Sequence, residues 1–157
     1  MKITTKAHYG LMAMCTLGAH YGQGPVSVRE IAEHQHCSDS YMEQLIGMLR
    51  KAKLVKSVRG AQGGYILTKP PDKITAAEMF KALEGPLVFT ECAADETSCS
   101  CTLECGCSSR FFWKDLHQHI NDFLESRSLE DLMHDERSEG RPNGIDETRK
   151  YIDKQDN

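Results

Sequence analysis

The chain has 157 residues, which is enough for one domain with an accessory element. It contains no run of about 18 apolar residues and no secretory signal pattern, so we expect a cytoplasmic protein without a membrane span. The net charge of −4 is unevenly distributed: residues 1–81 hold 11 Lys and Arg against 6 Asp and Glu, whereas residues 82–157 hold 8 against 17.

The first half of the chain predicts four helices and a hairpin. Apolar spacing and turn signals place helices over residues 5–19, 28–34, 40–52 and 74–85, and strands over residues 54–58 and 65–67. Ser27 is expected to cap the second helix, with Glu30 completing a capping box. Glycines between Arg59 and Tyr65 allow the tight reversal of a hairpin. This order predicts a mainly α fold, a winged helix-turn-helix.

Three of the predicted helices have an apolar face that should turn inward. The inward positions are expected to be Leu11, Met14, Cys15 and Gly18 on the first helix, Leu45, Met48, Leu49 and Ala52 on the third, and Ala76, Met79, Phe80 and Leu83 on the fourth. Cys15 is therefore interpreted as a small core residue, and Cys37, in the turn before the third helix, as a packing residue.

The predicted third helix and hairpin carry groups that suit DNA recognition. The side of this helix opposite the apolar face shows Ser40, Tyr41, Glu43, Gln44 and Lys51. Gln44 could pair with an adenine edge in the major groove, and Arg59 at the hairpin tip could enter a minor groove. Lys51, Lys53 and Lys56 could neutralise phosphates. A solvated charged face and a protein-binding winged helix are the alternatives.

Five of the seven cysteines lie within sixteen residues, C-terminal to the predicted wing and fourth helix. They are Cys92, Cys99, Cys101, Cys105 and Cys107. In a reducing compartment clustered thiols are metal ligands or redox sensors more often than disulfides, and an odd total does not suit a closed disulfide framework. An iron–sulfur cluster, a zinc site built from four of the five, and a thiol–disulfide switch are the three interpretations.

Two stretches resemble a family of bacterial regulators. Residues 38–45 have the sequence SDSYMEQL, and residues 54–65 have the sequence LVKSVRGAQGGY with its arginine-glycine wing. With the opening Lys2, Ile3 and Thr4, they resemble the Rrf-two family from residue 1 to about residue 133. The resemblance implies a dimeric winged-helix repressor or activator. The DNA-binding set implied in this way, together with the cations above, is Ser38, Ser40, Tyr41, Glu43, Gln44, Lys51, Lys56, Arg59 and Gly60.

The same resemblance suggests which cysteines bind metal. Some members of the family hold an iron–sulfur cluster with three cysteines in the loop before a long C-terminal helix, and others lack these cysteines and work without a cluster. Counting back from Trp113, near the start of that helix, assigns the ligands to Cys92, Cys101 and Cys107. A second possible set is Cys92, Cys99 and Cys105. A 2Fe–2S cluster is favoured over a 4Fe–4S cluster.

The fourth ligand of such a cluster stays open. Some relatives place a histidine three residues after the last cysteine, where this chain has Arg110. Cys99 or Cys105 could supply a thiolate instead, or a residue of the partner subunit could reach in. The family position for that partner residue is His8 in this chain, which is otherwise interpreted as a surface or packed histidine.

Residues 109–133 predict a long dimerisation helix. Apolar residues recur in it at three- to four-residue spacing, at Phe112, Leu116, His119 or Ile120, and Phe123. A chain this short cannot readily bury such a stripe without a second copy, so we expect a homodimer and a palindromic operator. The expected division is a DNA-binding domain over 1–86, a cluster-binding loop over 87–108, the dimerisation helix over 109–133, and a disordered tail over 134–157 with a weak helix around 145–152.

We therefore expect a DNA-binding transcriptional regulator and not an enzyme, because no histidine lies among the clustered cysteines to act as a base. Its operator binding would be controlled by the iron–sulfur cluster, and its targets would be genes of cluster assembly or related stress responses. A cluster-free repressor of cysteine and sulfur metabolism, or a nitric-oxide or redox sensor, is the alternative.

Overall fold

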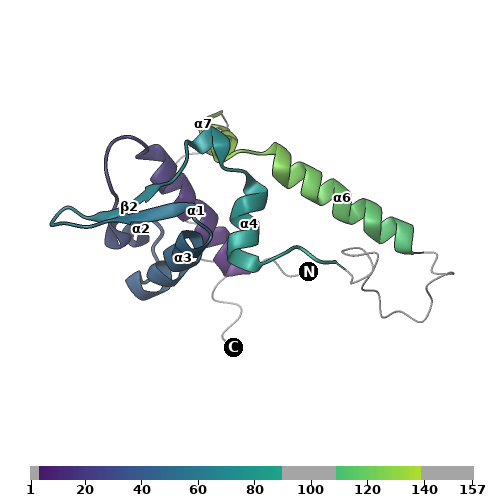
Figure 1. Ribbon diagram of the computed structural model, residues 1–157, viewed down its shortest axis with the longest axis horizontal. Coiled ribbons are helices and arrows are strands. Elements are labelled where there is room, and N and C mark those ends of the chain that lie inside the picture. The colour runs from purple at the N-terminus through teal and green to yellow at the C-terminus, as the bar shows by residue number, and fades with distance from the viewer. Residues whose placement is uncertain (1–3, 90–108, 139–157) are drawn as a thin grey trace.

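The computed structural model describes residues 4–89 and 109–138, which form a winged-helix domain and a C-terminal helix that extends away from it (Figure 1). In chain order the elements are α1 (Thr5–Ala19), α2 (Val28–His34), α3 (Asp39–Lys51), β1 (Val55–Val58), β2 (Gly64–Leu67), the 3-10 turn η1 (Pro71–Lys73), α4 (Ala76–Glu84), α6 (Arg110–Ser126) and α7 (Leu129–Ser138). β1 and β2 pair antiparallel, with Val58 opposite Gly64. The predicted mainly helical fold with a two-stranded wing is confirmed. Within the described ranges, no helix is long and apolar enough to cross a membrane.

Polar N-caps determine where the helices of the N-terminal half begin. Ser27 Oγ accepts a hydrogen bond from the N–H of Glu30 at 3.2 Å, so the predicted cap of α2 is present. Ser38 Oγ accepts from the N–H of Tyr41 at 3.3 Å, and α3 therefore begins at Asp39, one residue before the predicted start. The caps satisfy N–H groups that have no partner inside their own helix.

The main apolar core lies where α1, α3 and α4 pack against one another. Its fully buried side chains include Met14, Ile31, Met42, Leu45, Ile46, Leu49, Ile74, Met79, Leu83 and Leu129. Of the twelve predicted inward positions, Ala52 alone is exposed, so that part of the prediction is wrong. The reason is that α3 ends at Lys51, which leaves Ala52 as its C-cap in the following turn.

The C-terminal region contains two helices where the sequence predicted one over 109–133. α6 ends at Ser126, and the chain then pairs with the residues around the start of α4: Ala76 N donates to Arg127 O at 2.7 Å, and Leu129 N donates to Ile74 O at 2.8 Å. Ser128 caps α7, because its Oγ accepts from the N–H of Asp131 at 3.1 Å. The break exists because these bonds hold Arg127 in an extended conformation.

α7 attaches the C-terminal region to α1. Leu129 is fully buried in the core, and α7 packs along α1. A Cβ atom placed on Gly18 would lie 2.5 Å from Met133 Sδ, so the missing side chain of Gly18 makes the room that Met133 occupies. The helix continues to Ser138, which corrects the expected disordered tail from residue 134 for its first five residues. The weak helix expected around 145–152 lies outside the described residues.

Candidate nucleic-acid interface

Helix α3 packs one face against the core and presents the other to solvent. Its buried residues are Met42, Leu45, Ile46 and Leu49. Ser40, Glu43 and Gln44 lie on the exposed side, within the first two turns of the helix. The start of the second helix of a helix-turn-helix is the part that enters the major groove. Ser40, Glu43 and Gln44 therefore lie at the end of α3 that this motif uses, and their base-reading role stays a prediction.

Two of the predicted DNA-contacting residues make contacts inside the domain. The hydroxyl of Ser38 serves as the N-cap of α3 while the residue itself stays exposed. Tyr41 is half-buried, and its ring meets the ring of Tyr9 edge to face with centroids 5.8 Å apart. Its hydroxyl lies 3.5 Å from Thr5 Oγ1, at the limit of a hydrogen bond. Tyr41 thus connects the recognition helix to the first turn of α1.

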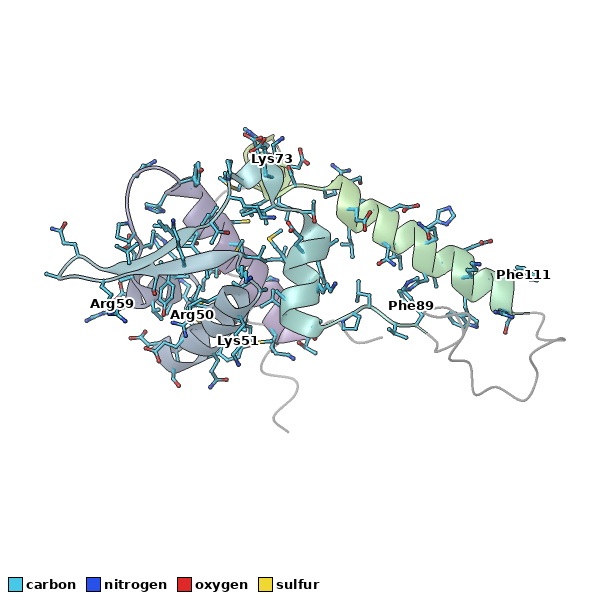
Figure 2. The ribbon with its side chains drawn as sticks, in the orientation of Figure 1. Arg50, Lys51, Arg59, Lys73, Phe89 and Phe111 are labelled. Carbon is cyan, nitrogen blue, oxygen red and sulfur yellow. The ribbon has the colours of Figure 1, made fainter. Side chains whose placement is uncertain are left out.

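Five exposed cations continue this surface from the end of α3 into the wing. They are Arg50, Lys51, Lys53, Lys56 and Arg59. Within residues 4–89 and 109–134 none of them takes part in an ion pair. In Figure 2 the labelled Arg50, Lys51 and Arg59 lie along one edge of the domain, beside α3 and the hairpin. Such a row of unpaired cations suits a phosphate backbone.

The hairpin tip owes its shape to Gly60. This residue has φ of +133°, a conformation that side chains rarely adopt, and its carbonyl accepts from the N–H of Gly63 at 3.0 Å. Arg59 directly precedes it and is exposed, so the tight turn leaves the guanidinium free to extend from the tip. Gly60 therefore contributes to the site through its backbone.

Arg29 on α2 is a further exposed cation, which the sequence patterns did not single out, and the charge of Asp39 at the start of α3 acts on it. It lies on the exposed side of α2, and its Nε donates to Glu33 Oε1 at 2.9 Å. The hydrogen bond and the charge of Glu33 raise the pKa of Arg29. The spacing of four residues between the two on a predicted helix was a visible sign of this pair. A guanidinium with an acidic partner is a weaker phosphate ligand than the unpaired cations of the wing.

The five clustered cysteines lie outside the described residues, so the structure tests neither set of ligands. The described residues on either side of the cysteines contact or begin α6: the ring of Phe89 meets that of His117 with centroids 6.1 Å apart, and α6 starts at Arg110. Figure 2 shows Phe89 beside α6. Thiolates are the ligands that soft metal ions and iron–sulfur clusters prefer.

The remaining candidate ligands belong to the described residues. His8 is exposed and its ring meets Tyr9 edge to face, with centroids 5.4 Å apart. Cys15 and Cys37 are half-buried and pack against the core, as predicted. Burial is the main cause that raises the pKa of the Cys37 thiol. Over residues 4–89 and 109–134, no group of three His, Cys, Asp or Glu side chains is placed to hold a metal ion.

The outer face of α6 exposes large apolar side chains. Phe111, Phe112 and Phe123 are 75%, 60% and 58% exposed. The residues of the predicted stripe differ in exposure: Phe112, His119 and Phe123 are exposed, whereas Leu116 and Ile120 are half-buried. Figure 2 shows Phe111 at the end of α6 that lies farthest from the domain. Apolar surface of this kind on an extended helix marks an interaction site.

Comparison with known proteins agrees with this arrangement. The family model Rrf2, described as an iron-dependent transcriptional regulator, matches residues 3–135. The regulator CymR of Bacillus subtilis is 42% identical over 132 residues, which cover 84% of this chain and 89% of CymR. The regulator IscR of Aliivibrio salmonicida is 40% identical over 135 residues, which cover 86% of this chain and 79% of IscR.

Solved structures are similar as well. The structure of CymR, the global cysteine regulator of B. subtilis, superimposes with a TM-score of 0.70 at 38% identity, covering 85% of this chain and 97% of CymR. T. potens IscR superimposes with a TM-score of 0.69 at 40% identity, covering 90% and 94%. These relatives are transcriptional regulators and not enzymes.

Proposed function

The chain belongs to the Rrf2 family of transcriptional regulators, and we propose that it acts as a homodimer whose operator binding is controlled by an iron–sulfur cluster. The observation that carries the proposal is the group of five cysteines between the wing and α6. Five thiols within sixteen residues supply enough thiolates to bind an iron–sulfur cluster, whose usual ligands are cysteines. The proposed targets are genes of iron–sulfur cluster assembly or related stress responses.

DNA recognition is assigned to α3 and the wing. The exposed Ser40, Glu43 and Gln44 enter the major groove in this proposal, and Gln44 offers the donor–acceptor pair that suits adenine. Lys51 and Lys56 neutralise phosphates, and Arg59 extends from the tip toward a minor groove. Hydrogen bonds to bases supply the sequence preference, and the cations supply affinity and salt dependence.

Homodimerisation is assigned to the outer face of α6. Phe111, Phe112 and Phe123 are exposed on a helix that extends from the domain, and a second copy of the same helix would cover them. A two-fold axis makes one patch complementary to itself. It also places two copies of α3 on one side of the duplex, about 34 Å or a multiple of that apart, which predicts a palindromic operator.

Cluster binding is assigned to Cys92, Cys101 and Cys107, with Cys99, Cys105 or His8 of the partner subunit as candidates for a fourth ligand. When bound, the cluster supplies a group that is sensitive to iron supply, oxygen and nitric oxide. The described residues on either side of the cysteines connect to α6: Phe89 packs on His117, and α6 begins at Arg110. We therefore propose that cluster binding affects the position of the dimer helix α6 before that of α3.

A cluster-free regulator like CymR is the second candidate, because CymR matches this chain as well as IscR does. A zinc site formed by four thiolates is the third. All three predict DNA binding, and they differ in metal content.

The experiment is purification without oxygen, followed by iron and sulfide analysis and absorbance spectroscopy. We expect a coloured protein whose operator affinity changes when the cluster is removed. The triple variant Cys92→Ala, Cys101→Ala, Cys107→Ala should be colourless, and Cys15→Ala is the matched control outside the segment. A colourless, iron-poor wild type, or equal operator affinity with and without cluster, would overturn cluster control while leaving DNA binding intact.

A further inference from the structure

The first turn of α3 makes an aromatic contact with α1. The middle of this helix is fixed by Leu45, Ile46 and Leu49, all of which are buried. Its first turn has Met42 in the core, and Tyr41 reaches from this turn to Tyr9 of α1. Rotation of the helix about its buried middle would therefore move Tyr41 against Tyr9.

The position of Tyr9 is fixed by its surroundings. It is half-buried and packs against the main core. The turn of α1 before it is tied to α4, because Glu84 accepts hydrogen bonds from the N–H and hydroxyl of Thr4 and from the N–H of Ala7. The interplanar angle of 88° between Tyr9 and Tyr41 is the edge-to-face geometry that aromatic rings prefer.

We propose that Tyr9 is a positioning residue that sets operator specificity, by holding the first turn of α3 where Ser40 and Gln44 can contact bases. This inference rests on the proposed DNA-binding function. Tyr9 itself touches no DNA in the proposal. Hydrogen bonds to base edges require accurate placement of the side chain, whereas phosphate contacts by flexible lysines tolerate small shifts.

A change at Tyr9 should affect binding to the operator and not binding to unrelated DNA. Without the ring of Tyr9, the affinity for the operator should fall and the affinity for unrelated DNA should stay, because Lys51, Lys56 and Arg59 lie at the other end of α3 and in the wing. Loss of an aromatic pair of this kind in both protomers of a dimer should lower the operator affinity roughly tenfold.

The experiment begins by selecting an operator from a random duplex library with the wild-type protein. Dissociation constants are then measured for that operator and for a shuffled duplex at one salt concentration. Tyr9→Met removes the ring and keeps an apolar side chain, and Tyr9→Phe keeps the ring. Tyr21→Met makes the same change at an exposed tyrosine beyond the end of α1.

The proposal expects Tyr9→Met to lower the ratio of specific to non-specific affinity about tenfold, with an unchanged salt dependence, and expects both controls to match the wild type. In the background of Tyr41→Met, the change at Tyr9 should have little further effect. An unchanged ratio, or equal losses on both duplexes, would overturn it. Should Tyr9→Met fail to fold, Tyr9→Trp changes the spacing to Tyr41 while keeping an aromatic ring and is judged by the same two outcomes. If the selection enriches no sequence, the proposed DNA-binding function fails, and this inference with it.

Discussion

Lys51→Ala should make operator binding less sensitive to salt. Lys51 is the last residue of α3, it is exposed, and it has no ion pair within the described residues. A phosphate contact by such a lysine releases a bound counterion from DNA, and the release makes affinity fall with salt. Removing the ammonium should therefore weaken binding most at low salt.

The expected change in salt dependence is calculated for a dimer, in which the substitution removes two lysines. Each phosphate contact contributes about −0.9 to the slope of log K against log salt concentration, and two protomers lose two contacts, so the slope should become shallower by about 1.8. From about 50 to about 200 mM salt, the wild type should accordingly lose about 12-fold more affinity than the variant. Sequence preference should be unchanged, because phosphates carry no base information.

Fluorescence anisotropy over a salt series measures the slope. The matched control is Lys73→Ala, since Lys73 is an exposed lysine on the opposite edge of the domain in Figure 2, where it pairs with Asp72 at 3.2 Å. This variant should keep the wild-type slope. The assignment of DNA to the edge formed by α3 and the wing would be refuted by an unchanged slope for Lys51→Ala, or by equal changes in the two variants.

Three further predictions concern stability. Leu129→Ala should lower the free energy of unfolding by about 3 kcal/mol in urea titrations, because Leu129 is fully buried, and a loss below about 1 kcal/mol would contradict its role as the anchor of α7. His36→Gly should raise the free energy of unfolding by about 0.5 kcal/mol, because His36 has φ of 51° in the turn before α3, and a lower thermal midpoint would count against strain there. Burial raises the pKa of Glu78, but hydrogen bonds from Lys69 and from the N–H of Thr75 outweigh it, so the pKa is lowered. A carboxylate whose pKa is lower in the folded than in the unfolded state stabilises the fold at pH values above its unfolded pKa, and this stabilisation is lost as the pH falls. Between about pH 5 and about pH 3 the wild type should therefore lose more free energy of unfolding than Glu78→Gln. Equal losses in the two proteins would disprove this.

The helices of the DNA-binding half could be predicted because their signals are local. Spacing of apolar residues, the caps at Ser27 and Ser38, and the glycines of the wing act within a few residues of one another. The break at Arg127 could not be found in this way. It depends on backbone hydrogen bonds from Ala76 and to Ile74, about 50 residues earlier in the chain, and apolar periodicity continues across it.

The site residues also differ in whether their placement depends on local or on long-range signals. Exposure of Ser40, Gln44 and Arg59 follows from the pattern of the helix and hairpin that carry them. The direction of Tyr41 does not, because a tyrosine beside exposed polar residues has the same pattern whether it points to DNA or to a neighbouring helix. Its contact with Tyr9 is set by how α1 crosses α3, which no local spacing encodes.

The packing of the helices also restricts how a change in the C-terminal region can reach the recognition helix. α6 packs on α4 and α7 packs on α1, while α1 and α4 both pack on α3. The bonds at Arg127 and Leu129 hold the junction between α6 and α7 to the residues around the start of α4, so a tilt of α6 must either break them or move α4 with it. Movement of α4 would carry Glu84, which holds the first turn of α1, and through that turn the support of Tyr41. Since coupling between distant sites requires a packed element with two arrangements, α4 and the first turn of α1 are the elements in which a second arrangement should be sought.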